Sequence, residues 1–164
     1  LAAEGVRTDP GTVEEYVGAL CEAFLVYKAS PLDVRGKELL KTGAKYYAVD
    51  TGLRRFLLGG RPGDSGRILE NVVFLELRRR HREVRIGRMP GREIDFIVRS
   101  GGDVRYYQVA ETLRDERTRE RELSPLLSIS DNYPKTVLTL DPDPPTSERG
   151  VRIENALDFL LGRT

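Results

Sequence analysis

The spacing of hydrophobic positions along the chain changes several times, and these changes divide it into predicted helices and strands. Residues 66–80 place apolar side chains at helical spacing, and a further helix is predicted over 114–129. Short strands rich in β-branched and aromatic residues are predicted at 83–88, 92–99, 104–110 and 135–140. An edge strand over 151–153 and a short apolar helix over 155–161 complete the order. This order predicts an α/β fold with a mixed sheet flanked by helices.

The amino-terminal part carries a different pattern. Residues 1–4 are predicted to be the tail of a helix. A second helix is predicted to begin after Asp9, which acts as the N-cap with Pro10 at the first helical position. Apolar residues at helical spacing follow from Val13 to Phe24. A short turn separates the two helices, an arrangement compatible with a helix-turn-helix.

Two β-rich runs, 24–28 and 45–49, are predicted to pair as a hairpin with a long tip. Two helices and a hairpin form the later part of a winged helix, so we expect a partial winged-helix-like segment over 1–49 and a second domain over 50–164. The exposed positions of the second helix include the acids Glu14, Glu15 and Glu22. Because these acids would repel a DNA backbone, the segment is predicted to have a structural or partner-binding role.

The turn between two of the strands predicts how they pair. Gly101-Gly102 is a strong signal for a two-residue hairpin turn. A tight turn there places Asp95 opposite Gln108 and Glu93 opposite Ala110. Since alternate strand residues share a face, these four side chains are predicted to project the same way.

Composition narrows the classes of protein that fit. Hydrophobic residues make up 39% and charged residues 32% of the 164 residues, which indicates a soluble globular protein with a highly charged surface. There is no apolar run of roughly 18 residues and no signal segment. The single cysteine, Cys21, fits a reducing compartment, so we expect a cytoplasmic protein. The single histidine, His81, excludes a histidine-rich metal site and a serine or cysteine triad. The chain begins with Leu1, not Met, and we expect it to be a fragment of something longer.

The net charge of +1 gives no global argument for nucleic acid, so any basic patch must be local. The candidates for nucleic-acid binding are Arg78, Arg79, Arg80 and Arg82. The alternative is that these arginines form a solvated helix end.

The order of a helix with a glutamate, a strand with an aspartate and a further strand resembles the PD-(D/E)XK nuclease fold, which is restriction-endonuclease-like. Five further stretches are informative: Lys45-Tyr-Tyr-Ala-Val-Asp-Thr-Gly-Leu53, Leu69-Glu-Asn-Val-Val-Phe-Leu-Glu-Leu77, Glu93-Ile-Asp-Phe96, Gln108-Val-Ala110 and Leu157-Asp-Phe-Leu160. Through these residues, nearly the whole chain resembles the carboxy-terminal domain of a family of prokaryotic AAA-type ATPases. The resemblance implies an upstream ATPase domain, and ATP is expected to bind only there.

In the active nuclease pattern, Asp95 and an acid at position 108 would hold Mg²⁺, and Glu70 would join them directly or through water. A lysine at position 110 would activate the attacking water, and the metal would polarise the phosphate. This sequence departs from the pattern twice, with Gln108 and Ala110. The predicted site, Glu70, Asp95 and Gln108, is therefore degenerate, and losing the lysine removes a contribution commonly worth a factor of roughly 10² or more in rate.

Other interpretations of these residues stay open. A lysine could reach the site from another element, and Lys135 is a candidate that would otherwise cap a strand. A carboxylate on the buried side of a helix needs a partner, and the backbone of the 50–53 turn could bond Glu70. A cation could also serve without any metal, and the candidates are Lys45, Arg92 and Arg99.

Three functions remain after these arguments. The first is an accessory carboxy-terminal domain of an ATPase, nuclease-like but not catalytic, that binds nucleic acid or a protein partner. The second is a variant Mg²⁺-dependent DNA endonuclease. The third is an oligomerisation or interaction module.

Overall fold

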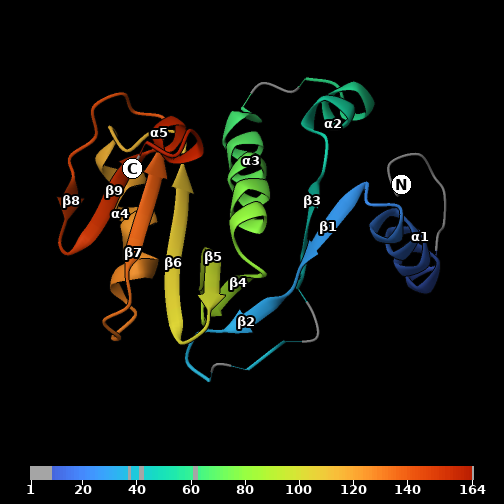
Figure 1. Cartoon of the computed structure of the whole chain (residues 1–164), viewed down its shortest axis with the longest axis horizontal. Coiled ribbons are helices and arrows are strands. Elements are labelled where there is room, and N and C mark those ends of the chain that lie inside the picture. Colours follow the sequence, from blue (N-terminus) through green and yellow to red (C-terminus); the bar gives the residue numbers. More distant parts are fainter. Residues whose placement is uncertain (1–8, 37, 41–42, 61–62, 164) are drawn as a thin grey trace.

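The computed structural model describes residues 9–36, 38–40, 43–60 and 63–163, so the helix tail predicted at 1–4 lies outside the described residues. Figure 1 shows a sheet between helices, with the amino-terminal elements extending to one side. The helices are α1 (Pro10–Glu22), α2 (Thr51–Leu58), α3 (Ser65–Arg80), α4 (Glu116–Leu127) and α5 (Ala156–Leu160). The strands are β1 (Val26–Ala29), β2 (Pro31–Asp33), β3 (Lys45–Ala48), β4 (Glu83–Met89), β5 (Arg92–Ser100), β6 (Asp103–Ala110), β7 (Lys135–Thr139), β8 (Ser147–Glu148) and β9 (Val151–Asn155).

The main sheet has seven strands in the order β2-β4-β5-β6-β7-β9-β8. Strands β4, β5 and β6 are antiparallel neighbours, whereas β6, β7 and β9 run parallel, as do β2 and β4. The predicted α/β class with a mixed sheet and flanking helices is confirmed. Among the described residues, no helix has the length and apolar character that crossing a membrane requires.

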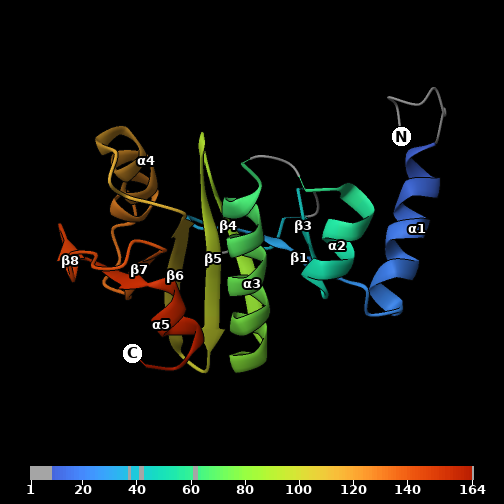
Figure 2. The same ribbon diagram turned by 90° about the horizontal axis from the view of Figure 1, so that it is seen from above.

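Different helices cover the two faces of the main sheet (Figure 2). Helices α3 and α5 pack on one face, where Phe74 and Phe159 join Phe96 in one apolar cluster. Helix α4 packs on the other face, where Leu123 and Leu126 lie in a second cluster. Both faces of the central strands are therefore buried, and this explains their nearly continuous apolar sequences.

The hairpin of β5 and β6 has the predicted turn and register. The chain turns at Gly101-Gly102, and Gly101 has a φ of +62°, which favours glycine. The pairs run from Ser100–Asp103 to Phe96–Tyr107 and follow the expected register throughout.

Strand β5 carries a β-bulge on its other edge. Arg85 of β4 pairs with Ile97, but Gly87 pairs with Ile94, so β5 holds one more residue than β4 in this interval. Two residues of β5, Asp95 and Phe96, therefore lie opposite the single residue Ile86 of β4. A bulge locally changes which way side chains point, and here it lies at the predicted site.

The amino-terminal segment is tied to the main sheet. Strands β1 and β3 pair antiparallel in a sheet of their own, which confirms the pairing predicted for the two β-rich runs. The predicted hairpin tip contains β2, which pairs parallel with β4 at the sheet edge. Helix α1 starts at the predicted Asp9 cap and buries none of its residues. It lies at the end of the molecule farthest from β8 (Figures 1 and 2).

Candidate functional site

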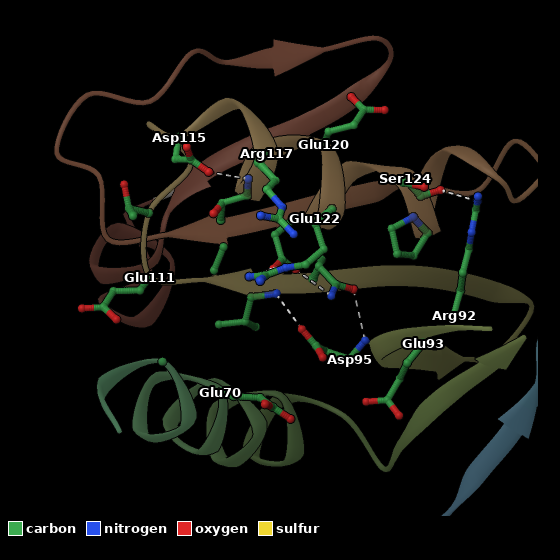
Figure 3. A pocket seen from close by; sticks show the side chains of 18 of the residues that line it. Glu70, Arg92, Glu93, Asp95, Glu111, Asp115, Arg117, Glu120, Glu122 and Ser124 are labelled. Carbon is green, nitrogen blue, oxygen red and sulfur yellow. Dashed lines mark hydrogen bonds and ion pairs between the residues drawn. The ribbon is translucent and has the colours of Figure 1, made fainter. Parts of the chain in front are cut away.

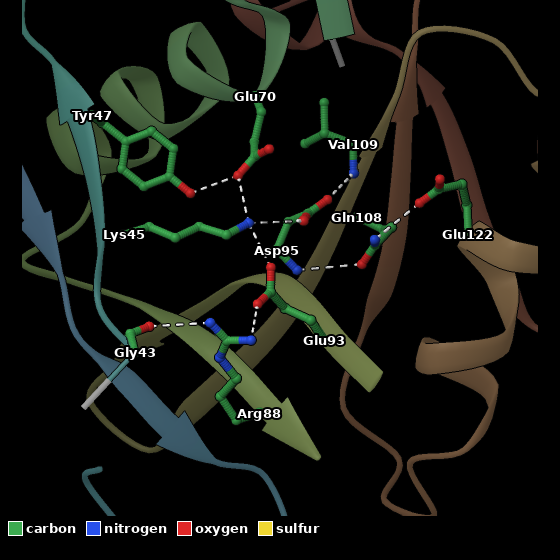
Figure 4. A network of polar contacts seen from close by, with 10 residues as sticks. All are labelled: Gly43, Lys45, Tyr47, Glu70, Arg88, Glu93, Asp95, Gln108, Val109 and Glu122. Carbon is green, nitrogen blue, oxygen red and sulfur yellow. Dashed lines mark hydrogen bonds and ion pairs between the residues drawn. The ribbon is translucent and has the colours of Figure 1, made fainter. Parts of the chain in front are cut away.

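Lys45 of β3 lies at the centre of the polar network in Figure 4. Its Nζ lies 2.9 Å from Glu70 Oε1 on α3 and 2.5 Å from Glu93 Oε1 on β5. The Oδ1 atom of Asp95 is 3.8 Å away. The second oxygen of Glu93, Oε2, lies 2.5 Å from Nη1 of Arg88. One ammonium group therefore contacts three carboxylates, and we call Glu70, Glu93 and Asp95 the carboxylate centre.

Neighbouring contacts hold Lys45 in this position. Lys45 and Tyr47 are two residues apart on β3, so their side chains point to the same side of the strand. The hydroxyl of Tyr47 donates a hydrogen bond of 2.7 Å to the same Glu70 oxygen. Asn71, next to Glu70 on α3, accepts from the N–H of Ala48 at 2.9 Å and donates to its carbonyl at 2.8 Å. These bonds fix β3 against α3.

Asp95 lies where β5 and β6 separate. Direct pairing of the two strands ends at Phe96 and Tyr107. Beyond that pair, side chains bridge the strands: the N–H of Asp95 donates to Gln108 Oε1 at 3.3 Å, and the N–H of Val109 donates to Asp95 Oδ2 at 2.9 Å. The bulge and these bridges together leave a cleft between the strand ends and α4.

The prediction that Glu93, Asp95, Gln108 and Ala110 share a face is wrong. Glu93 and Asp95 lie on the α3 side of the main sheet, in contact with Lys45. Gln108 lies on the other side, where its Nε2 donates to Glu122 of α4 at 3.0 Å, and Ala110 packs in the cluster beneath α4. The physical reason is the β-bulge, because one extra residue shifts the alternation of β5 relative to β6.

The three predicted metal ligands are thus only partly brought together. Glu70 and Asp95 meet at the lysine, while Gln108 reaches only the backbone of Asp95. Of the three cations predicted as partners of Glu70, the structure places Lys45 against it. Arg92 instead donates to the carbonyl of Ser124.

The arrangement does not fit a metal ion. Within the described residues, no group of three or more histidine, cysteine, aspartate or glutamate side chains could hold one. Magnesium needs several oxygen ligands directed at one point. Here the carboxylates of Glu70 and Glu93 are directed at an ammonium, and the Gln108 amide is bonded to Glu122.

Burial and charge shift the pKa values of two groups at the centre. Burial raises the pKa of Asp95 to about 8, and the negative charge of Glu70 adds to this shift. Burial by itself lowers the pKa of Lys45, but the hydrogen bond to Glu93 and the charge of Glu70 outweigh it and leave the pKa above its ordinary value. Lys45 is therefore charged at neutral pH, and Asp95 releases its proton less readily than an ordinary aspartate.

A cleft of about 1500 Å³ opens beside the centre, between β5, β6, α3 and α4 (Figure 3). Its carboxylates are Glu70, Glu93, Asp95, Glu111, Asp115, Glu116, Glu120 and Glu122. Its arginines are Arg67, Arg92, Arg117 and Arg121. Carboxylates outnumber arginines by eight to four, so the cleft favours cationic over anionic ligands.

Of the arginines predicted to bind nucleic acid, Arg78, Arg79 and Arg80 end α3 and bond within the chain, and Arg82 lies exposed just beyond it. Arg79 and Arg80 both contact Glu76, and hydrogen bonds from Arg79 and Arg80 lower the pKa of Glu76 to about 2. Arg80 also donates to the carbonyl of Phe159 at 2.6 Å. Arg78 donates to the carbonyl of Arg82 at 2.6 Å.

Lys135, the lysine considered as a substitute for position 110, starts β7 and is bonded away from the centre. Its Nζ lies 3.5 Å from Asp131 Oδ1 and also donates to the Asp131 carbonyl. This agrees with the alternative in which it caps a strand.

Four residues of the site were not found from the sequence. Tyr47 and Asn71 lie inside the quoted motifs, so their presence in those motifs was the available signal. Glu122 sits in the charged early part of a predicted helix, and nothing in the sequence sets it apart from its neighbours. Arg88 is distinguished only by its place near the end of a strand.

Comparison with known proteins gives two matches. The family described as "Domain of unknown function (DUF8612)" matches residues 2–64. An "Uncharacterized protein" of Haemophilus influenzae is 42% identical over 161 residues, which is 98% of this chain and 40% of the relative. The chain therefore spans less than half the length of this relative. No solved structure matches the chain.

Proposed function

We propose that the chain is an accessory domain of a longer protein, with a nuclease-like fold that does not cut nucleic acid and that binds a protein partner. The observation that carries the proposal is the ammonium of Lys45 between Glu70, Glu93 and Asp95. These are the oxygens that a catalytic divalent cation would need. With an ammonium there, no metal-bound water is generated to attack a phosphate.

The order of elements supports the nuclease-like part of this proposal. Helix α3 carries Glu70, β5 carries Asp95, and the β6-α4-β7 unit follows, which is the order of the restriction-endonuclease-like pattern. Helix α1 and the β1–β3 hairpin fit the partial winged-helix-like segment. By its resemblance to AAA-type ATPases, the longer protein is proposed to be such an ATPase, with ATP bound in its other part.

Two observations favour a protein partner over nucleic acid. The cleft is acidic, and the guanidinium groups of Arg78, Arg79 and Arg80 at the end of α3 are engaged in bonds within the chain. In contrast, large apolar side chains are exposed on the amino-terminal elements: Tyr16 is 66%, Phe24 70% and Phe56 84% exposed. Exposed aromatic side chains of this kind are typical anchors of protein interfaces.

The proposal is tested with supercoiled plasmid and with Mg²⁺ or Mn²⁺. We expect no metal-dependent nicking or linearisation by the purified chain. The matched control is Asp95→Ala, which should give the same trace background as the wild-type chain. Metal-dependent cleavage that disappears in Asp95→Ala would refute a non-catalytic domain.

The second candidate is the variant endonuclease, and one observation favours it. Lys45 lies close to Glu70 and Asp95, so it could supply the positive charge that Ala110 cannot. In that case Lys45→Met would abolish a cleavage activity present in the wild-type chain. Under the non-catalytic proposal there is no activity for this substitution to remove.

A further inference from the structure

We infer that the amino-terminal end of the chain pairs with the same end of a second copy, with helix α1 of each copy packed against helix α2 of the other. The inference rests on the proposed function in one respect, because it names the protein partner proposed there as a second copy of this chain. The surface concerned, which we call the amino-terminal apolar surface, is formed by α1, the end of the β1–β3 hairpin and α2. It consists of Tyr16, Leu20, Phe24, Leu25, Val49, Leu53, Phe56 and Leu57.

Exposed apolar side chains are concentrated at this end of the molecule. Twelve of the fourteen large apolar side chains that are exposed among the described residues lie between the start of α1 and the end of α2. On α1, Tyr16 and Leu20 are one turn apart and share a face. On α2, Leu53, Phe56 and Leu57 have the spacing of a single helix face. Each helix therefore presents an apolar face to solvent.

The residue that follows α1 indicates that its ring is used for binding. Phe24 has a φ of +57°, in the left-handed region where glycine is the usual residue at the end of a helix. The N–H of Phe24 donates to the carbonyl of Cys21, and the N–H of Leu25 donates to that of Leu20, which are the two bonds of such a helix end. This backbone conformation costs free energy for a residue with a Cβ, and the ring is 70% exposed, so it gains little by packing within the chain. Contact with a second molecule would offset the cost.

The amino-terminal apolar surface is large enough for a stable dimer. A standard protein interface buries about 800 Å² on each partner. The rings of Tyr16, Phe24 and Phe56 are 66%, 70% and 84% exposed, and at roughly 150–250 Å² for each whole ring they supply roughly 300–600 Å². The exposed leucines and Val49 provide the remainder. A monomer seldom leaves an apolar patch of this size uncovered.

The charges of the two helices decide which elements meet. Helix α1 contains the acids Glu14, Glu15 and Glu22 and no lysine or arginine. Helix α2 contains two arginines and no acid, and one of the two, Arg54, is bonded to Asp64. Two copies of α1 side by side would bring like charges together, three from each copy, whereas α1 against α2 avoids this repulsion.

The position of the two helices allows a two-fold arrangement. Both lie at the same end of the molecule, on the far side of α3 from α4 (Figure 2). A two-fold axis at this end lets each α1 meet the other copy's α2, so that the dimer has two equivalent contacts. The cleft beside the carboxylate centre lies between α3 and α4 and stays accessible in such a dimer.

Sedimentation of the purified chain over a range of concentrations tests for the dimer. We expect a concentration-dependent dimer whose dissociation constant rises roughly 30-fold or more in Tyr16→Glu and in Phe56→Lys, the loss typical of an interface hot spot. Both residues are exposed and both replacements are good helix formers, so the fold is retained, which circular dichroism checks. Leu157→Lys is the matched control, because Leu157 is 54% exposed on α5, outside this surface, and should leave the dissociation constant unchanged.

Mixing the two variants separates the pairing of α1 with α2 from other arrangements. In a mixed dimer, one contact keeps both Tyr16 and Phe56, and the other brings the introduced glutamate and lysine together. The equimolar mixture should therefore associate more tightly than either variant alone, by roughly the same 30-fold. If α1 instead met α1, every contact would contain one altered residue and mixing would bring no gain.

Phe24→Gly gives a measurement that a merely structural role would not produce. It should raise the dissociation constant and at the same time raise the urea midpoint of the dilute monomer, since glycine adopts the left-handed conformation without cost. A chain that stays monomeric at all concentrations overturns the inference and leaves the rest of the longer protein as the occupant of this surface. A mixture no tighter than its components overturns the pairing of α1 with α2. Metal-dependent plasmid cleavage would instead overturn the proposed function, so the two failures are distinguishable.

Discussion

The carboxylate centre shows how side chains of the chain itself can provide partners for largely buried acids. Glu70 accepts from Lys45 and from the Tyr47 hydroxyl, and Glu93 is shared between Lys45 and Arg88. Each of these carboxylates has charged or hydrogen-bonding partners, as buried acids require. Asp95 differs, because it is the most deeply buried of the three and bonds mainly to backbone.

The pKa of Asp95 predicts how stability depends on pH. The folded chain keeps the Asp95 proton up to a pKa of about 8, whereas an unfolded aspartate releases it near a pKa of about 4. Between these values the folded state binds more protons than the unfolded state, so the free energy of unfolding must fall as pH rises. The contribution is at most about 1.4 kcal/mol per pH unit.

Asp95→Asn should remove this part of the slope, since asparagine stays neutral. Urea unfolding between about pH 6.5 and pH 8 measures it for both chains. The pKa of His81 is lowered by burial, so this histidine contributes a slope of the opposite sign near its unfolded pKa of about 6.5, and this slope is common to both chains. A slope that is equally steep in both chains would show that Asp95 is not the titrating group.

The sequence predicted Glu70 and Asp95 as site residues, but not what they contact. Glu70 and Asp95 could be predicted because helical spacing and a hairpin turn place each on a definite element. Lys45 is 25 residues from Glu70, on a strand that is not part of the main sheet. Only the folded chain selects it from the three cations that the sequence left open.

At the level of elements, the bulge in β5 decides the geometry of the site. It turns Asp95 toward α3 while Gln108 continues toward α4. A single extra residue is invisible in a pattern of alternating apolar and polar positions, because β5 is buried on both faces and does not alternate. The register of β5 and β6 between the Gly101-Gly102 turn and the bulge could be predicted, since it depends only on that turn.

Gly87 lies opposite this bulge and should tolerate no side chain. A Cβ there would lie 2.7 Å from Ile94 Cβ and 3.0 Å from Ile97 Cδ1. Gly87→Ala is expected to lower the free energy of unfolding by about 1–3 kcal/mol, as overpacking of a core does. Gly18→Ala is the control, because its Cβ would meet nothing within 4 Å and should stabilise helix α1 by roughly 0.5–1 kcal/mol. Equal changes in the free energy of unfolding for the two substitutions would contradict the close packing of β5 against Gly87.

Asn71 should hold β3 on α3 through its two bonds to Ala48. Asn71→Ala leaves the N–H and the carbonyl of the half-buried Ala48 without these partners, and we expect a loss of about 1–3 kcal/mol in the free energy of unfolding. Urea unfolding measures the loss, and faster hydrogen exchange at the Ala48 amide localises it. Asn132→Ala, at an exposed loop position, should change neither quantity. Unchanged exchange at Ala48 in Asn71→Ala would contradict this role.

Strand β2 was not predicted from the sequence. It has only three residues, Pro31–Asp33, too few for a period to be recognised. It nevertheless pairs with β4 and brings a piece of the amino-terminal segment into the main sheet. The segment predicted as 1–49 therefore shares its packing with the rest of the chain.

For the whole molecule, the distribution of charge disfavours nucleic-acid binding. The cleft is acidic, and Arg78, Arg79 and Arg80 lie eight to ten residues further along α3 from Glu70, which is roughly 12–15 Å on a helix. The net charge of +1 adds little attraction over the whole surface.

We therefore predict that the chain binds short duplex DNA no more tightly than a Kd of about 10⁻⁴ M at physiological salt, the weak end of non-specific binding. Fluorescence anisotropy over a range of salt concentrations measures the affinity and its salt dependence. Replacing Arg78 and Arg82 by serine should leave the Kd and its salt dependence unchanged, because these arginines are not expected to contact DNA phosphates. A micromolar Kd that weakens steeply with salt, and weakens further in that double variant, would instead establish the carboxyl end of α3 as a nucleic-acid interface. The acidic cleft would then need a different ligand from the DNA, because eight carboxylates and four arginines line it.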